Sequence, residues 1–328
     1  LGLNVFFLLY LEDLATSNAF FDSIYFSNFE VSYIFISNLI ASGVTLILVL
    51  DFFKKIKLKF NWSLWKSMMK YALPVLVAGV AFSINEVVDR LFLERMLPED
   101  IAREQVGIYS ACYKLGMFMT LFATAFRLGI EPFFFSHASS KHPKTAYAMI
   151  TKYFVIIGTV ILLFVIVFAD ILKVLLIQDE TYWEAIKIVP IILLANLFLG
   201  IYHNLSVWYK VTDKTHYGAY ISTIGALLTI GINVWLIPVI GYVGSAIATL
   251  AAYGSMMLIS YFLGQKHYAI PYKYGKMLTY ISVSILFSLI SFYYFRGNYG
   301  VGISLILIFC LGVFFNERKE IYRLINSK

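Results

Sequence analysis

The chain has 328 residues, of which 60% are hydrophobic and 14% are charged, and its mean hydropathy is +0.79. An ordinary soluble domain is about one-quarter charged, so this composition excludes a water-soluble fold and indicates a protein of the lipid bilayer. The net charge of +7 gives no reason to expect nucleic-acid binding, because the excess Lys and Arg fall in alternate loops.

Apolar runs separated by short polar breaks follow one another along the chain. The first full run, 31–50, supplies 20 residues without a charge, which is the length that a helix needs to cross ~30 Å of hydrocarbon. Similar runs follow at 71–93, 106–135, 153–172, 185–209, 217–238, 242–263, 277–295 and 299–315. A transmembrane barrel would show alternating segments of about ten residues instead. We therefore expect an all-α integral membrane protein, a polytopic bundle with nine full spans.

Residues 1–11 form a shorter apolar segment that resembles the end of a further span. The segment has neither the basic flank nor the small-residue cleavage site of a signal peptide. We therefore expect the chain to lack the N-terminal part of a longer protein and to begin within a partial span. A stub lying in the membrane interface is the alternative.

The loops between the spans predict the orientation, because Lys and Arg are retained on the cytoplasmic side. One alternating set of loops, together with the C-terminal tail, carries 17 Lys and Arg residues, whereas the opposite set carries four. The basic set includes the loop 51–70, which alone has six lysines. This asymmetry predicts a cytoplasmic C-terminus.

Catalytic or metal-binding motifs are absent from the sequence. Cys112 and Cys310 both fall within apolar runs and are expected to be packing residues. The five histidines have no paired ligand spacing, and neither a phosphate-binding glycine loop nor a nucleophile motif is present. We expect no enzyme activity, no catalytic residue, no cofactor and no metal site.

The run 71–93 contains four polar residues on one helical face: Asn85, Glu86, Asp89 and Arg90. At 100° per residue they occupy an arc of about 140°. Glu86 and Arg90 have the i, i+4 spacing of an internal ion pair. Because a charge near the bilayer centre costs ~3 kcal/mol, this face is expected either to line a transport pathway or to be neutralised at a helix contact.

The next run, 106–135, holds Lys114, Arg127 and Glu131. Arg127 and Glu131 share a face, while Lys114 points elsewhere on the helix. The rise of 1.5 Å per residue places Lys114 near the middle of the membrane and Arg127 near the cytoplasmic surface, where snorkelling is the alternative to a functional role. Four weaker embedded polar residues are expected mainly to join helices: Asn196, His203, Asn204 and Asn233.

Several phrases of the sequence carry a family resemblance. They are KYALPVLVAGVAFSINEVVDRLFL at 70–93, QVGIYSACYKL at 105–115, AFRLGIEPFFF at 125–135 and IPVIGYVGSAIATL at 237–250. In their order and spacing the chain resembles bacterial polysaccharide biosynthesis flippases, the lipid-linked oligosaccharide (O-antigen type) exporters of the multidrug/oligosaccharidyl-lipid/polysaccharide exporter superfamily.

This resemblance implies a two-lobed fold of fourteen helices, of which the chain would hold helices 5 to 14. The implied domains are the end of the N-terminal lobe at 1–50, a basic cytoplasmic inter-lobe loop at 51–70 and a C-terminal six-helix lobe at 71–263. Two additional helices and a cytoplasmic tail would occupy 264–328. The charge-derived orientation agrees with this count of helices.

The function implied by the resemblance is flipping of undecaprenyl-diphosphate-linked oligosaccharide from the cytoplasmic to the outer leaflet of the bacterial plasma membrane. Candidate contacts to the diphosphate or sugar are Arg90, Lys114, Arg127 and Asn85. The remaining charges of the two helices would bind a coupling proton or sodium ion or form ion pairs: Glu86, Asp89 and Glu131. Membrane lipid, a polysaccharide polymerase and glycosyltransferases would be partners.

Two other functions are compatible with a bundle of this kind. A multidrug or cation antiporter of the same superfamily would bind cationic substrates through Glu86 and Asp89 and would not need Lys114. A membrane-embedded polysaccharide polymerase would be expected to carry a large outer loop with essential arginines. The longest outer loop here, 12–30, has no arginine.

Overall fold

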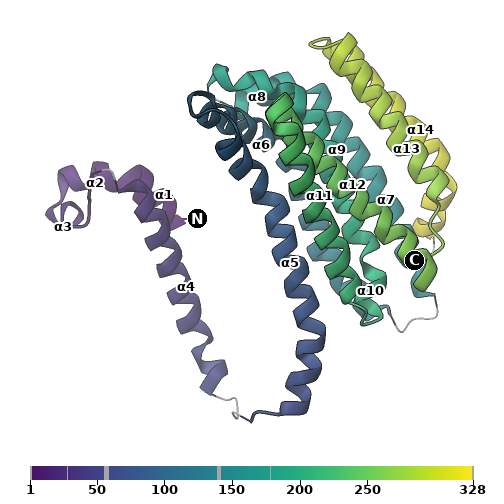
Figure 1. Cartoon of the computed structure of the whole chain (residues 1–328), viewed down its shortest axis with the longest axis horizontal. Coiled ribbons are helices and arrows are strands. Elements are labelled where there is room, and N and C mark those ends of the chain that lie inside the picture. Colours follow the sequence, from purple (N-terminus) through teal and green to yellow (C-terminus); the bar gives the residue numbers. More distant parts are fainter. Residues whose placement is uncertain (1, 28, 55–58, 139–141, 178, 327–328) are drawn as a thin grey trace. The chain divides into compact units, whose positions relative to one another are not determined.

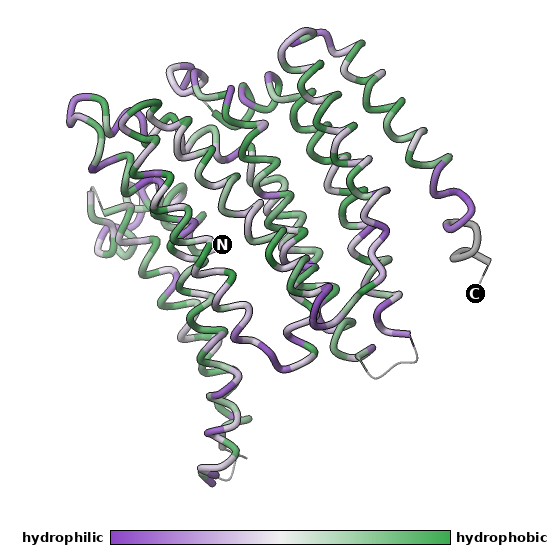
Figure 2. Tube along the Cα trace, turned by 45° about the vertical axis from the view of Figure 1, so that its right-hand side comes forward, coloured by the Kyte–Doolittle hydropathy of each residue, from purple (hydrophilic) through white to green (hydrophobic). Residues whose placement is uncertain are grey.

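The structure is a computed structural model that describes residues 2–27, 29–54, 59–138, 142–177 and 179–326, with the side chains of 30, 54 and 321–326 left out. Within these ranges, nine helical segments are long and apolar enough to cross a membrane. This confirms the expected all-α bundle with nine full spans. Figure 2 shows hydrophobic residues along the helices and hydrophilic residues at many of the turns between them.

The long helices have the following bounds: α4 (Glu30–Lys54), α5 (Trp62–Met96), α6 (Glu99–Ser136), α7 (Pro143–Val167), α9 (Val189–Leu205), α11 (His216–Ile240), α12 (Tyr242–His267), α13 (Tyr274–Leu289) and α14 (Tyr299–Asn326). Shorter helices lie between them: α1 (Gly2–Val5), α2 (Leu11–Ser17), α3 (Ala19–Asp22), α8 (Ala169–Leu176) and α10 (Val207–Val211). A 3-10 segment, Glu180–Ile188, leads into α9, and two π-helical segments occupy Phe6–Tyr10 and Ile290–Tyr294.

The chain divides into two compact units, Leu1–Trp65 and Lys66–Lys328. Helices extend into the loop expected at 51–70, because α4 runs to Lys54 and α5 already begins at Trp62. Residues 55–58 of that loop lie outside the described part of the chain. The two helices therefore reach further into 51–70 than the sequence predicts.

The first unit is organised around Tyr33 on α4. Its ring is buried and stacks on Phe7, with 5.3 Å between the ring centroids. Its hydroxyl accepts a hydrogen bond from the backbone N–H of Phe26 and donates one to the carbonyl of Ile24. One tyrosine thus fixes the turn that precedes α4.

The core of the second unit lies among α6, α7, α9, α11 and α12, which run side by side in Figure 1. Close packing depends on small residues at the contacts. A Cβ atom at Gly200 of α9 would stand 2.3 Å from the ring of Phe154 on α7, which real structures do not tolerate. Gly200 therefore lets α7 and α9 pack directly on each other.

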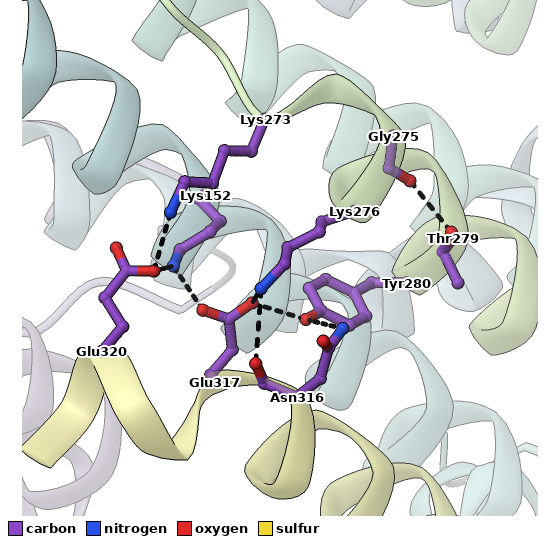
Figure 3. Close-up of polar contacts among 9 residues, drawn as sticks. All are labelled: Lys152, Lys273, Gly275, Lys276, Thr279, Tyr280, Asn316, Glu317 and Glu320. Carbon is purple, nitrogen blue, oxygen red and sulfur yellow. Dashed lines mark hydrogen bonds and ion pairs between the residues drawn. The ribbon is translucent and has the colours of Figure 1, made fainter.

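The C-terminal pair, α13 and α14, packs on α7. At one end of the pair, Glu317 of α14 accepts hydrogen bonds from Lys152 of α7 and from Lys276 and Tyr280 of α13 (Figure 3). At the other end, Arg296 donates two hydrogen bonds, of 2.9 and 2.8 Å, to Asp170 of α8. Ion pairs therefore hold both ends of the pair to α7 and α8.

Candidate functional site

Buried polar side chains meet where α5 faces α6, α11 and α12. Three of these helices contribute a pair of polar residues spaced i, i+4, which places both members of each pair on one helical face. The pairs are Asn85 and Asp89 on α5, Thr229 and Asn233 on α11, and Ser245 and Thr249 on α12. All six side chains are buried.

Asp89 is the centre of this cluster and is 2% exposed. Its Oδ2 atom accepts hydrogen bonds from the hydroxyls of Tyr109 (2.8 Å) and Thr249 (2.9 Å). Its Oδ1 atom accepts one from the amide of Asn233 (3.0 Å). Every one of these donors is neutral, so within the described residues the carboxylate has dipoles around it and no ion-pair partner.

The rest of the cluster links the same helices. The Thr229 hydroxyl donates to Oδ1 of Asn85 (2.6 Å), and the Ser245 hydroxyl donates to Oδ1 of Asn233 (2.8 Å). Gly225, one turn before Thr229, leaves room for Met256, whose sulfur would lie 2.4 Å from a Cβ atom there. The cluster is thus a closed hydrogen-bond network, whose partners set the positions of α5, α11 and α12.

Glu86 and Arg90 lie half-buried beside the cluster. Arg90 donates to the backbone carbonyl of Glu86 (2.7 Å) and to the hydroxyl of Ser110 (3.3 Å), and its guanidinium lies 4.9 Å from the ring centroid of Tyr113. The Glu86 carboxylate accepts a hydrogen bond from Tyr253 (2.7 Å) instead. The i, i+4 spacing therefore brings Arg90 to the backbone of Glu86, and each charge has its own partner on another helix.

Lys114 is exposed on α6, although its neighbours Tyr113 and Leu115 are buried. Its ammonium group has no hydrogen bond or ion pair with any residue that the structure describes. It shares an exposed stripe of α6 with Met117, Leu121 and Leu128. Lys114 therefore places a free positive charge on an otherwise apolar surface of the second unit, and its role in a transport cavity stays a prediction.

Arg127 and Glu131 belong to a different place, a pocket where the end of α6 meets α9 and α10. The Lys210 ammonium group forms an ion pair with the Glu131 carboxylate, with 2.6 Å between Nζ and Oε1. Lys210 belongs to a segment expected to be a loop, and His203 and Asn204 also line the pocket. The seven candidate residues thus separate into the α5 group, the single Lys114 and this pocket.

Sequence reasoning missed most of the Asp89 network. Tyr109, Thr229, Ser245 and Thr249 were not identified, and Asn233 was expected mainly to join helices. Hydroxyl residues are common in membrane helices, so none is conspicuous alone. The available signal was the repeated i, i+4 spacing of polar residues in two apolar runs.

The oxygen atoms around Asp89 suit a proton or a monovalent cation. They comprise the Asp89 carboxylate and the hydroxyls of Tyr109 and Thr249, and such hard oxygen atoms are typical ligands of non-transition cations. Within the described ranges no group of three His, Cys, Asp or Glu residues could hold a metal ion. The cluster therefore offers one negative charge and a polar cage.

Comparisons with known proteins fit this fold. Residues 74–235, from α5 into α11, match the MatE family model. No curated protein matches the chain. The lipid II flippase MurJ, in an inward closed conformation, is 18% identical with a TM-score of 0.66, and the alignment covers 90% of this chain and 64% of MurJ.

Two further solved structures are similar. One is a MOP superfamily transporter from Pyrococcus furiosus, described as having a binding pocket of reverse polarity that suggests a different function. It is 17% identical, with a TM-score of 0.51. The other is an outward-facing multidrug resistance transporter of the MATE family, 17% identical with a TM-score of 0.52. Each alignment covers 68% of this chain and 52% of the other chain.

These comparisons confirm the expected exporter fold. The chain is a multi-pass helical protein with the fold of MOP superfamily transporters, and its residues 74–235 match the MatE family model. It spans 64% of the length of MurJ and 52% of the other two proteins.

Proposed function

We propose that this chain belongs to a transporter that flips undecaprenyl-diphosphate-linked oligosaccharide from the cytoplasmic to the outer leaflet of the bacterial plasma membrane. The observation that carries the proposal is the unpaired Lys114 on an apolar exposed stripe of α6, close in sequence to the Arg90 partner Ser110. The likeness to MurJ over 90% of the chain supports it, because MurJ is a lipid II flippase.

The physical basis is the cost of moving a diphosphate through hydrocarbon. A bare charge of this kind cannot enter the bilayer core, whereas cationic groups on the protein lower the barrier while the lipid tail stays in the membrane. A guanidinium and an ammonium group are the side chains that bind phosphate oxygens best. Arg90 and Lys114 therefore act as the phosphate contacts of this chain, and Asn85 is a positioning residue within the buried network.

Asp89 supplies the coupling step in this proposal. A buried carboxylate with only neutral donors binds a proton or a sodium ion, which changes the charge between α5, α11 and α12 and hence their preferred packing. Glu86, with its single tyrosine partner, is the second acidic group near this step. In this proposal the C-terminus lies on the cytoplasmic side. Glycosyltransferases supply the substrate, and a polysaccharide polymerase consumes it.

The test is complementation of a bacterial strain that lacks its own lipid-linked oligosaccharide exporter. Lys114→Ala and Arg90→Ala should each abolish surface polysaccharide while the protein remains in the membrane. Lys266→Ala, at an exposed lysine near the end of α12, is the matched control and should have no effect. Normal surface polysaccharide in both Lys114→Ala and Arg90→Ala would contradict the proposal.

A multidrug or cation antiporter is the second candidate. The buried acidic group Asp89 favours it, as does the MatE match at 74–235. The same strains distinguish the two functions by drug tolerance. An antiporter would raise tolerance to cationic drugs in a manner that depends on Asp89 and Glu86 and is unchanged in Lys114→Ala.

A further inference from the structure

The pocket at the end of α6 carries more binding chemistry than its own contacts use. Arg127 lines one wall, and its guanidinium has no hydrogen bond or ion pair among the residues that the structure describes. Asn204 lines another wall and is 4% exposed, and its Oδ1 atom has no hydrogen-bond partner within the described part of the chain. A buried acceptor without a partner is costly, so a site where both groups lack a hydrogen-bond partner among the described residues is suited to a ligand.

The charges of the pocket favour an anion. Arg127 and Lys210 provide two positive charges against the single carboxylate of Glu131, and both cations lie near the ring of His203. The Lys210 ammonium is held 2.6 Å from Glu131, which leaves Arg127 as the open cation. A guanidinium presents a planar fork of N–H donors that matches the oxygens of a phosphate group.

The other walls favour a hydroxylated group next to that phosphate. The Glu131 carboxylate and Oδ1 of Asn204 are acceptors, and sugar hydroxyls are donors. Phe134 closes the pocket from α6 with an apolar face. Acceptors and an aromatic wall beside an arginine form a combination that suits a phosphorylated sugar better than a bare phosphate ion.

The size of the pocket sets how much of the ligand it takes. The space open to the centre of a water molecule is about 10 Å³, within about 320 Å³ of empty space that is partly open to the outside. This is room for about one water-sized group at a time. The pocket therefore grips the edge of a headgroup at its mouth and does not enclose the whole molecule.

We propose that the pocket of Arg127, Glu131, His203, Asn204 and Lys210 is a second ligand site, which binds the phosphate and adjoining hydroxyls of a phosphorylated sugar headgroup. This inference rests on the proposed function for its role, the loading of substrate at the end of the unit that carries the basic loops. It lies apart from Arg90 and Lys114, so one headgroup can be handed from this pocket to those cations.

The test measures protection of arginines in the whole purified chain. Phenylglyoxal modifies accessible arginine side chains, and mass spectrometry resolves each site. Glucose 1-phosphate should slow modification of Arg127 at least about tenfold, because charge-assisted hydrogen bonds contribute about 1.5–3 kcal/mol each. Glucose alone should give no protection. Arg103, an exposed arginine on the same helix, is the internal control and should react equally in all samples.

Two further probes separate the sources of a phosphate group. Inorganic phosphate should protect Arg127 more weakly than glucose 1-phosphate, and vesicles of phosphatidylglycerol should not protect it. Equal protection by inorganic phosphate would overturn the sugar part of the proposal. Protection by the vesicles alone would assign the pocket to membrane lipid and overturn the proposal as a whole, as would an unprotected Arg127 with every probe.

Variants measured by equilibrium dialysis complete the test. Arg127→Lys keeps the charge but loses the guanidinium fork, and it should weaken glucose 1-phosphate binding about tenfold. Arg103→Ala should bind as the parent chain does. Binding is read without transport, so a chain that fails complementation can still bind at this pocket. If the chain transports but Arg127 is not protected by any probe, the pocket proposal is wrong and the proposed function stands.

Discussion

Asp89 and Glu317 are two carboxylates with nearly equal burial and opposite surroundings. Asp89 is 2% exposed and accepts hydrogen bonds only from Tyr109, Thr249 and Asn233, which are neutral. Glu317 is 1% exposed and accepts hydrogen bonds from the ammonium groups of Lys152 and Lys276 (Figure 3). One buried carboxylate therefore accepts hydrogen bonds from cations, and the other accepts them only from neutral groups among the described residues.

The two environments have different physical consequences. A buried ion pair fixes geometry, because removing either partner leaves an uncompensated charge in a medium of low polarity. A buried carboxylate held by neutral donors keeps a negative field that a proton or a cation can cancel. Glu317 therefore locks the C-terminal helix pair onto α7, whereas Asp89 is available for a change of charge.

The largest expected effect is on transport by Asp89→Asn. The amide keeps the shape of the side chain but removes its charge, so transport should fall by on the order of 100-fold, equivalent to about 3 kcal/mol. Folding should be unchanged or improved, because no buried charge remains. Transport assays and thermal unfolding of the same sample measure both. A strongly destabilised Asp89→Asn variant that still transports would reverse the roles assigned to the two carboxylates.

Glu317→Gln should give the opposite pattern. The variant leaves Lys152 buried with only the partly exposed Glu320 as an acidic partner, so the stability should fall by about 3 kcal/mol. Transport per folded molecule should change little. Asp100→Asn, at an exposed carboxylate, is the control for charge removal. If the double variant Lys152→Met, Glu317→Leu is no more stable than Glu317→Gln, the buried ion pair is not the source of the loss.

Tyr109→Phe tests the neutral donors one at a time. It removes one of the two hydroxyl oxygens beside Oδ2 of Asp89, and the affinity for a coupling sodium ion should fall about tenfold, because one oxygen ligand is lost. Tyr113→Phe is the matched control, because the hydroxyl of Tyr113 makes no hydrogen bond with the described residues. The sodium and pH dependence of transport gives the measurement. Equal effects of the two variants would show that the hydroxyl on Asp89 has no special role.

The smallest effect is expected at Asp170, an ion-paired carboxylate outside the spans. The hydrogen bonds from Arg296 hold its pKa at about 2, below the ordinary 3.8. A carboxyl group whose pKa is lowered by folding contributes stability that is complete above its pKa in the unfolded chain. This stability is lost as the pH falls through its pKa in the folded chain. The free energy of unfolding of the parent chain should therefore exceed that of Asp170→Asn by about 1 kcal/mol or less near pH 7, because solvent screens this ion pair. This difference should decline below pH 4 in melting curves, and a difference independent of pH down to 2 would contradict the ion pair.

The sequence predicts the spans well, because apolar length is a local property. The clearest shift is at α7, which begins at Pro143, ten residues before the expected start at 153, and ends at Val167. Lys152 is a charged residue next to the apolar run, so the run predicted from the sequence starts after it. Its partner Glu317 lies 165 residues away and neutralises it, and no local pattern reveals that pairing.

The candidate site was predictable only in part, because many of its contacts join residues that lie far apart in the sequence. The shared face of Asn85 and Asp89 follows from helical spacing, and both lie in one network. The partners of Asp89 come from α6, α11 and α12, so they depend on how helices pack. Likewise, Lys210 reaches Glu131 across 79 residues and enters the pocket from a segment expected to be a loop.

The attachment of α5 has a consequence for motion. Its backbone approaches the neighbouring helices less closely than those helices approach one another. Side-chain hydrogen bonds bridge the distance: Asn85, Glu86 and Asp89 accept them from α11 and α12, and Arg90 donates one to α6. A packed apolar contact between two helices is lost as a unit when they separate. Separate side-chain hydrogen bonds can be replaced by hydrogen bonds to water one at a time. The position of α5 therefore depends strongly on these side-chain hydrogen bonds.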